Sequence, residues 1–323
     1  MWFQVMRDPV LGCMVAALWG LCWPGTVQAQ TLPPGAAEAV GRTLGNRVEA
    51  FSVLGGDRGL IDGKYTWPDQ HATVDITKFA WQAELHQDDP LPLWNGLRWS
   101  PLIEGAGGYL SSRSQNIGNV LEGNETISHA AVISLGVGAR VYFTDDLSVL
   151  CAVDVFYTHI NSRLDAQTAF GRQVLAELNG SSSGLALEIL TFAPQAEIRY
   201  RHRWGDIRLE VTSRFVFFHD EIVGSAPQFF EAESQIWHNS IFVEYWTPLR
   251  FWDQQVRVGA GIDRAELYGG LSSAADARHV YTAGGHVVTG PLWIFEYIGL
   301  YAAHEWATSF SGNSLGVDIS VAF

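Results

Sequence analysis

The sequence has few basic residues, few cysteines and no long apolar segment beyond its first residues. Its 323 residues include 20 Lys and Arg against 34 Asp and Glu, a formal net charge of −14. Binding to nucleic acid through phosphate neutralisation is therefore not expected, because it depends on a surplus of basic side chains. No apolar run of about 18 residues follows the N-terminus, so membrane-spanning helices are not expected either.

Apolar residues, aromatic residues and glycine are abundant instead. Hydrophobic residues make up 47% of the chain and charged residues only 17%, whereas soluble domains average about 25% charged residues. The chain also has 33 glycines and 13 tryptophans. This composition is typical of an all-β membrane protein or of an aromatic-rich secreted domain.

Residues 1–29 are interpreted as a secretory signal peptide. Arg7 precedes an apolar stretch that is too short to span a bilayer, and Val27-Gln28-Ala29 resembles a small-residue cleavage site. The signal predicts export, with residues 30–57 as a lead-in segment and 58–323 as a membrane barrel.

Cysteine is nearly absent from the exported part. Cys13 and Cys22 would leave with the signal peptide, so Cys151 would remain alone and no intramolecular disulfide could form. Cys151 shares its strand face with Leu147, Val149, Val153 and Val155, and it is therefore expected to face lipid.

Alternation of apolar and polar residues predicts about twelve strands. Many have ten or more residues, a length that suits strands crossing a membrane at a tilt. The expected ranges are 59–67, 72–85, 97–111, 127–142, 147–162, 187–202, 205–220, 232–248, 253–268, 278–289, 292–306 and 314–323.

The connections between these strands alternate in length. Tight turns are expected after even-numbered strands, at 144–146, 203–204, 248–252 and 290–291, whereas the connections after odd-numbered strands are mostly longer and polar. Short periplasmic turns and long extracellular loops are typical of outer-membrane barrels with an even number of strands. We therefore expect both ends of the barrel chain in the periplasm and segment 163–184 outside the cell.

The two faces of the strands differ in polarity. In the seventh strand Ile207 and Val211 lie on one face, while Arg208 and Arg214 lie on the other. A one-residue slip would place charges in lipid at about 2–4 kcal/mol each near the midplane, so the charged row is expected to face the lumen. The expected lumen residues are Arg140, Asp154, Glu197, Arg199, Arg201, Arg208, Glu210, Arg214, Arg257, Asp263, Glu296 and Asp318.

Aromatic residues gather near the tight turns, where a membrane-interface girdle is expected. The alternative is cross-strand stacking in a soluble β-sandwich, which the export signal and the strand lengths disfavour. The expected girdle residues are Tyr142, Phe143, Trp204, Trp246, Phe251, Trp252, Trp293 and Phe295.

The last ten residues alternate in polarity and end on an aromatic residue, with Leu315, Val317, Ile319, Val321 and Phe323 as the apolar positions. This segment resembles the C-terminal insertion signal of Gram-negative outer-membrane barrels. The resemblance implies insertion by the barrel-assembly machinery into the bacterial outer membrane, in contact with lipid and lipopolysaccharide.

Together, the strand count, acidic charge and lead-in segment resemble the autotransporter-type β-domain over about residues 34–323. Only about thirty residues lie between Gln30 and the first strand, so a solitary barrel without a passenger is expected. Pro34–Gly56 has apolar residues near helical spacing. The resemblance implies a helix that threads the pore, and a short periplasmic helix is the alternative.

The expected function is that of a translocator or a narrow passive pore. A barrel enzyme acting on lipid or lipopolysaccharide is the main alternative, because His159, Asn161 and Ser162 lie at the expected outer rim. Their spacing is not diagnostic, since a catalytic triad is recognised by geometry. A third alternative is an adhesive barrel whose loops bind a partner. No catalytic residue, cofactor or metal site is expected, and the oligomeric state is left open.

Overall fold

A computed structural model of the chain describes residues 59–68, 71–86, 89–115, 125–165, 167–169, 172, 184–223, 233–291 and 295–321. All of them belong to one compact unit, Leu32–Phe323. The predicted signal peptide and the predicted helix at 34–56 lie outside the described residues. In the described part of the chain, no helix has the length and apolar character needed to cross a membrane.

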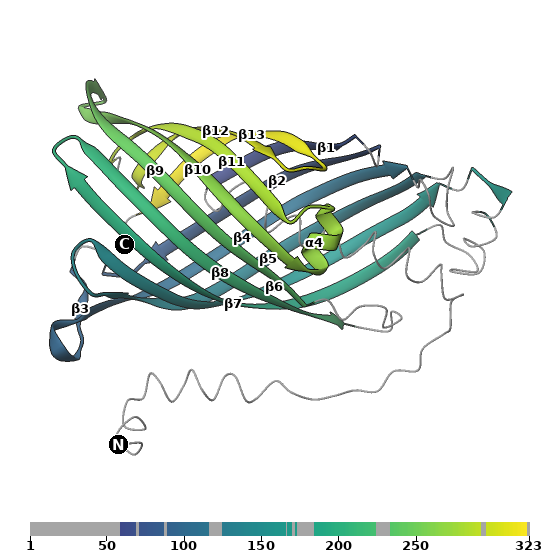
Figure 1. Ribbon diagram of the computed structural model, residues 1–323, viewed down its shortest axis with the longest axis horizontal. Helices are drawn as coiled ribbons and strands as arrows, with labels where there is room; N and C mark the ends of the chain where they lie inside the picture. Colours follow the sequence, from purple (N-terminus) through teal and green to yellow (C-terminus); the bar gives the residue numbers. More distant parts are fainter. Residues whose placement is uncertain are drawn as a thin grey trace, which may run out of the picture. The chain divides into compact units, whose positions relative to one another are not determined.

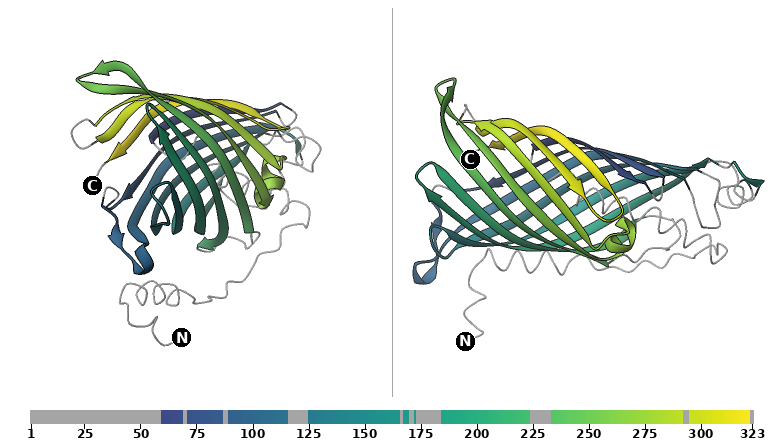
Figure 2. Two further views of the ribbon diagram at one scale, coloured as in Figure 1. Left: turned by 60° about the vertical axis from the view of Figure 1, so that its left-hand side comes forward. Right: turned by 45° about the horizontal axis from the view of Figure 1, so that its top comes forward.

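Thirteen strands form one antiparallel sheet, and twelve of them, all except the two-residue β3 (Leu91–Pro92), close it into a barrel (Figure 1). The barrel closes where β1 (Gly59–Trp67) pairs with β13 (Ser311–Val321), with Leu60 opposite Val317 and Thr66 opposite Ser311. Figure 2 shows from two further sides how the sheet curls to bring these strands together. The predicted twelve-stranded antiparallel barrel is confirmed.

The other strands overlap all the ranges expected from the sequence, and several are longer at the end that carries the longer connections. They are β2 (Ala72–Glu84), β4 (Arg98–Gln115), β5 (Glu125–Tyr142), β6 (Leu147–Asp165), β7 (Gly184–Trp204), β8 (Ile207–Val223), β9 (Glu233–Phe251), β10 (Gln254–Gly269), β11 (His279–Thr289) and β12 (Phe295–Trp306).

Two of the tight turns differ from the prediction. The turn expected at Arg203–Trp204 is wrong, because β7 continues to Trp204 and the chain reverses at Gly205, whose φ of 57° favours glycine. The turn expected at 248–252 is shorter than predicted. It consists of Trp252 and Asp253, both with positive φ, which is the conformation of a two-residue hairpin turn.

Two short helical segments were not predicted. The 3-10 helix η2 (Trp94–Gly96) lies in the connection between β3 and β4, and α4 (Gly270–Ala275) lies between β10 and β11. Following the topology expected from the sequence, we call the end of the barrel with α4 the outer end, and the end with the turns at 143–146, 205–206 and 252–253 the periplasmic end. Figure 1 shows α4 at the ends of β10 and β11.

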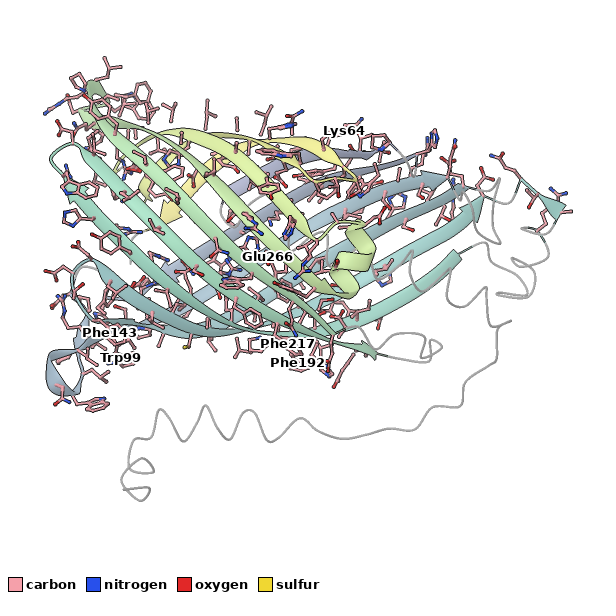
Figure 3. The ribbon with its side chains drawn as sticks, in the orientation of Figure 1. Lys64, Trp99, Phe143, Phe192, Phe217 and Glu266 are labelled. Carbon is pink, nitrogen blue, oxygen red and sulfur yellow. The ribbon has the colours of Figure 1, made fainter. Side chains whose placement is uncertain are left out.

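Successive side chains alternate between the two faces of the barrel wall. In β5, Ile133 and Leu135 are exposed on the outside, while the intervening Ser134 and Gly136 are buried toward the lumen. Aromatic side chains such as Phe192 and Phe217 also project from the outside of the sheet (Figure 3). Cys151 is exposed on this same outward face of β6, between the buried Leu150 and Ala152. The outer surface is therefore an apolar band suited to lipid.

Candidate functional site in the barrel lumen

The outer half of the lumen is lined by one cluster of buried apolar side chains, which we call the apolar ring. Its members come from β1, β2 and β4 to β11, with contributions from α4 and the β12–β13 connection. They are Tyr65, Trp67, Ala72, Val74, Ile76, Leu110, Ala130, Val132, Ile160, Ile189, Ala193, Val216, Phe218, Ile236, Ala265, Leu267, Leu271, Val280 and Phe310.

The helix α4 is attached to the outer rim of this ring. Its carbonyl oxygen at Ala275 accepts hydrogen bonds from the Trp67 indole at 3.4 Å and from the Ser309 hydroxyl at 2.6 Å. The Trp67 and Phe310 rings lie 4.6 Å apart between centroids, and Leu271 of α4 is a member of the ring. These contacts join β1, α4 and the β12–β13 connection around the outer opening.

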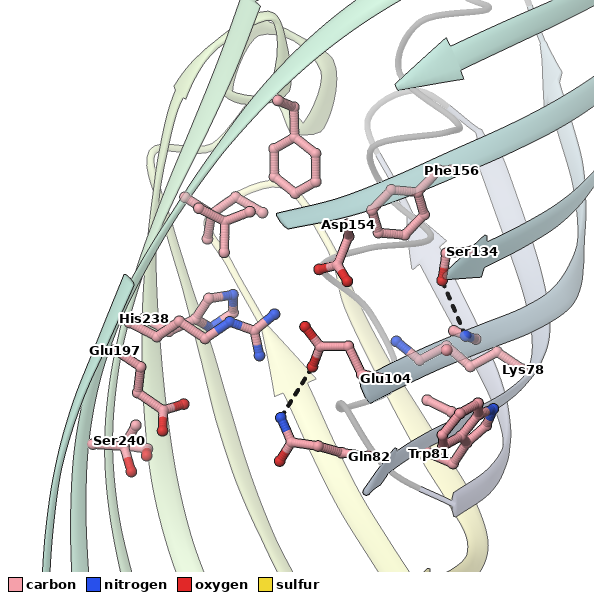
Figure 4. A pocket seen from close by; sticks show the side chains of 18 of the residues that line it. Lys78, Trp81, Gln82, Glu104, Ser134, Asp154, Phe156, Glu197, His238 and Ser240 are labelled. Atoms are coloured by element: carbon pink, nitrogen blue, oxygen red, sulfur yellow. Dashed lines mark hydrogen bonds between the residues drawn. The ribbon is translucent and has the colours of Figure 1, made fainter. Parts of the chain in front are cut away.

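Below the ring, the lumen contains a polar cavity of about 230 Å³. Its wall includes Glu104, which accepts a hydrogen bond from the Gln82 amide at 3.0 Å (Figure 4). Glu104 also accepts a hydrogen bond from the Gln195 amide. Gln195 also donates to Asp154 at 2.8 Å. A Cβ atom at Gly136 would lie 1.7 Å from the Asp154 carboxylate, so glycine there leaves room for this side chain. Amides and carboxylates from non-neighbouring strands thus meet inside the barrel.

The periplasmic half of the lumen contains a buried charge network around Arg140. Arg140 is 1% exposed and contacts Glu84 at 3.2 Å and Glu197 at 2.9 Å. Glu197 also contacts Arg199 at 3.0 Å, and the Ser148 hydroxyl accepts a hydrogen bond from Arg140. Such buried charges are tolerated only when they are paired and hydrogen-bonded. The network therefore connects β2, β5, β6 and β7 across the lumen.

A second network lies around Glu244 of β9. Its carboxylate contacts Arg208 at 2.9 Å and Arg257 at 3.3 Å. His286 lies between Glu244, at 3.5 Å, and Asp318, at 2.8 Å. This network extends from β8 to β13, on the part of the wall that the Arg140 network does not reach.

All predicted lumen charges except Glu296 have described side chains. Arg140, Asp154, Glu197, Arg199 and Arg257 are buried, and the others are half-buried on the face that holds the buried residues of their strands. The half-buried residues are Arg201, Arg208, Glu210, Arg214, Asp263 and Asp318. The side chain of Glu296 lies outside the described ones.

The predicted insertion signal is described only in part. Leu315 is exposed on the outward face, and Val317 and Ile319 are half-buried positions of the same parity. The side chain of Val321 and the whole of Phe323 lie outside the described residues.

Sequence reasoning placed two aromatic residues on the wrong face. Trp246 was expected in the interface girdle, but it pairs directly with the buried Arg257 across β9 and β10 and therefore shares the inward face. Tyr142 also points inward, where its hydroxyl donates to Glu84. Phe143, Trp204, Phe251 and Trp252 are exposed near the periplasmic turns, and the side chains of Trp293 and Phe295 lie outside the described ones.

Several lumen residues were missed by the sequence analysis. They are Lys78, Glu84, Glu104, Gln195 and His286. The alternation of side chains along β2 could have identified Lys78 and Glu84 as lumen residues, because both alternate with apolar or aromatic residues. The outward Asp62, Lys64 and Asp75 obscured that signal, because they place charges on the lipid-side face of β1 and β2 near the outer end.

Two of the three residues considered for catalysis, His159 and Asn161, lie on the outside of β6. His159 is exposed and 4.0 Å from the Glu188 carboxylate of β7, and Asn161 is exposed on the same face. The side chain of Ser162 lies outside the described ones. Within the described ranges, no group of three or more His, Cys, Asp and Glu side chains is placed to hold a metal ion.

Comparison with known structures shows the same fold in autotransporter barrels. The transport unit of AIDA-I from Escherichia coli has 10% identity and a TM-score of 0.53, over 90% of this chain and 100% of that one. The translocator domain of NalP from Neisseria meningitidis has 13% identity and a TM-score of 0.51, over 89% and 97%. The β domain of the Bordetella autotransporter Brka has 12% identity and a TM-score of 0.49, over 81% and 96%.

A search of curated protein sequences found no significant match. Residues 70–296, more than half of the chain, match the family described as the solitary outer membrane autotransporter β-barrel domain. The closed twelve-stranded barrel and the outward apolar band agree with that match. The chain therefore belongs to the family of solitary outer membrane autotransporter β-barrel domains.

Proposed function

We propose that this domain is a passive conduit of the translocator type, hydrated from the periplasmic end and closed at rest by the apolar ring. The division of the lumen carries this proposal. Charged networks and a polar cavity occupy its periplasmic and central parts, whereas apolar side chains predominate in its outer part, where the buried Glu305 accepts a hydrogen bond from Tyr65 of the ring. The AIDA-I and NalP structures, described as a transport unit and a translocator domain, support the same reading.

The physical basis is the different affinity of the two halves for water. Carboxylates, guanidiniums and amides keep water in the polar half, because each has more hydrogen-bonding capacity than its protein partners use. An apolar constriction loses its water and stops ions without a covalent or steric gate. Ions therefore reach the central cavity freely but cross the ring only at a low rate.

The proposal includes export through residues 1–29 and contact of the outward apolar band with lipid and lipopolysaccharide. It also includes recognition of the last strand, from Leu315 to Phe323, by the barrel-assembly machinery. The conduit has no catalytic step in this proposal. Lipid hydrolysis by the purified barrel that is lost on His159→Ala would support the enzyme alternative instead.

Two leucines on the same face of β4 allow a matched test of the ring. Leu110 is a fully buried ring member, and Leu102 is an equally buried leucine of a small separate cluster nearer the periplasmic end. We expect Leu110→Ser to raise single-channel conductance in planar bilayers several-fold, because a hydroxyl lowers the cost of wetting the ring. Leu102→Ser should leave conductance near the wild-type value. Equal effects of the two substitutions would contradict a closure located at the ring.

A further inference from the structure

Two arginines face each other directly at the periplasmic end of the lumen. Arg203 of β7 and Arg208 of β8 are cross-strand partners next to the turn at Gly205. Like charges at such positions are destabilising, because their side chains project from the same face about 5 Å apart. Arg203 is exposed, and its Nε donates only to the Gly205 carbonyl oxygen among the contacts described, at 2.8 Å.

A third arginine converges on the same place around an aromatic ring. The guanidinium carbons of Arg203, Arg208 and Arg257 lie 4.3, 5.3 and 5.7 Å from the centroid of the Trp246 ring. The ring comes from β9, so four strands contribute to the cluster. An aromatic face attracts guanidiniums and keeps their planes in place, but it supplies no negative charge to neutralise them.

The hydrogen-bonding capacity of the arginines is only partly used. Glu244 accepts one contact from Arg208 and one from Arg257, although each guanidinium has five N–H groups. The Nε atoms of Arg208 and Arg257 are buried and have no partner among the described residues, and the Arg257 side chain is 9% exposed. Buried donors without partners are costly, and they point to a missing acceptor.

The charged surroundings favour an anion over a cation. Glu244 is already shared among Arg208, Arg257 and His286, and Arg201 is paired with Glu210 at 2.8 Å. Asp318 is paired with His286 at 2.8 Å, and Asp206 lies in the turn after β7, where its backbone carbonyl accepts a hydrogen bond from the Trp246 amide. His286 is held between Glu244 and Asp318 and adds no negative charge.

We infer that Arg203, Arg208, Arg257 and Trp246 form an anion-binding site at the periplasmic mouth of the lumen, for small molecules with two or more carboxylate or phosphate groups. The planar guanidinium presents paired N–H groups that match both oxyanions. A bound oxyanion would relieve the repulsion between Arg203 and Arg208 and would supply acceptors for the free N–H groups. The site does not depend on whether the apolar ring opens.

Calorimetric titration of the full, detergent-solubilised chain tests this site without requiring a conducting pore. Citrate and inorganic pyrophosphate are the probes, at low ionic strength, because salt screens exposed charges. We expect saturable binding of at least one probe with one molecule per barrel. Stronger binding of citrate would identify a carboxylate ligand, and stronger binding of pyrophosphate a phosphate ligand.

Arg203→Gln is the informative variant, because Arg203 is exposed and makes no described ion pair, so its loss should leave the fold intact. We expect it to weaken binding about tenfold, the effect of losing one charge-assisted contact. Arg98→Gln is the matched control, since Arg98 is a half-buried arginine at the same end but is already paired with Asp145 at 2.5 Å. The Arg98→Gln variant should bind the probes as tightly as the wild type does.

A heat-modifiability gel confirms that each variant is folded before titration. Absence of saturable binding of both probes to the wild type would overturn the inference. Equal weakening of binding by Arg203→Gln and Arg98→Gln would also overturn the inference, because the probes would then respond to the overall positive charge of the mouth and not to a specific site.

Discussion

At the scale of single residues, the lumen depends on close contacts between large side chains and glycine. Tyr65 is fully buried and donates a hydrogen bond to Glu305 at 3.1 Å. Its ring passes over two glycines, Gly63 on its own strand and Gly312 on β13, where a Cβ would lie 2.7 and 2.2 Å from its atoms. These contacts lie at the β1–β13 junction, so they help to hold the barrel closed.

Gly312→Ala should therefore destabilise the barrel by about 1–3 kcal/mol, the usual cost of overpacking a well-packed core. The added methyl would also lie 2.6 Å from the Lys64 carbonyl oxygen, which belongs to the backbone and cannot rotate away. Urea unfolding in lipid vesicles measures the change. Gly107→Ala is the control, because its Cβ would meet only the Val132 carbonyl oxygen, at an ordinary 3.7 Å. Equal stabilities of the two variants would contradict the role of Gly312.

At the scale of strands, the sequence predicted what depends on periodicity and missed what depends on pairing in space. Alternation located all twelve long strands, because one face meets lipid and the other the lumen. It could not locate α4 or η2, which are too short to show a period. It also could not reveal that Gln195 of β7 reaches Glu104 of β4, since those strands are separated by β5 and β6. The turn after β7 was misplaced because Trp204 extends the strand.

Cys151 tests the orientation of β6, because it is the only cysteine from Gln30 onward. Its thiol lies on the outward face, where surrounding lipid would keep a charged, water-soluble reagent away. We expect a charged, membrane-impermeant maleimide to modify it slowly in barrels folded into vesicles. Asp145→Cys in a Cys151→Ser background is the control, since Asp145 is exposed in the periplasmic turn and should react fast. Similar rates at the two positions would place Cys151 in contact with water.

At the scale of the whole barrel, the two halves of the lumen differ in what they can hold. The polar half uses charge networks that link strands across the barrel, whereas the outer half offers apolar surface on nearly every strand. Alternation alone could not predict this division, because it reports which face a residue occupies and not its height along the axis. The apolar ring therefore suits an apolar partner, and the apolar stripe expected for Pro34–Gly56 supplies one within the same chain.

Deletion of residues 34–56 tests that pairing at the level of the conduit. We expect the shortened barrel to insert normally, because the expected insertion signal lies at Leu315–Phe323, and to show higher single-channel conductance. Each ion pair between a charge of the segment, such as Glu38 or Arg42, and a charge of the hydrated lumen should stabilise the segment in the pore by on the order of 1 kcal/mol or less. The wild-type conductance should therefore rise with salt more steeply than that of the shortened barrel, because screening weakens those pairs. Equal conductance of the two barrels would remove the segment from the pore and favour a periplasmic helix, with the apolar ring alone closing the lumen.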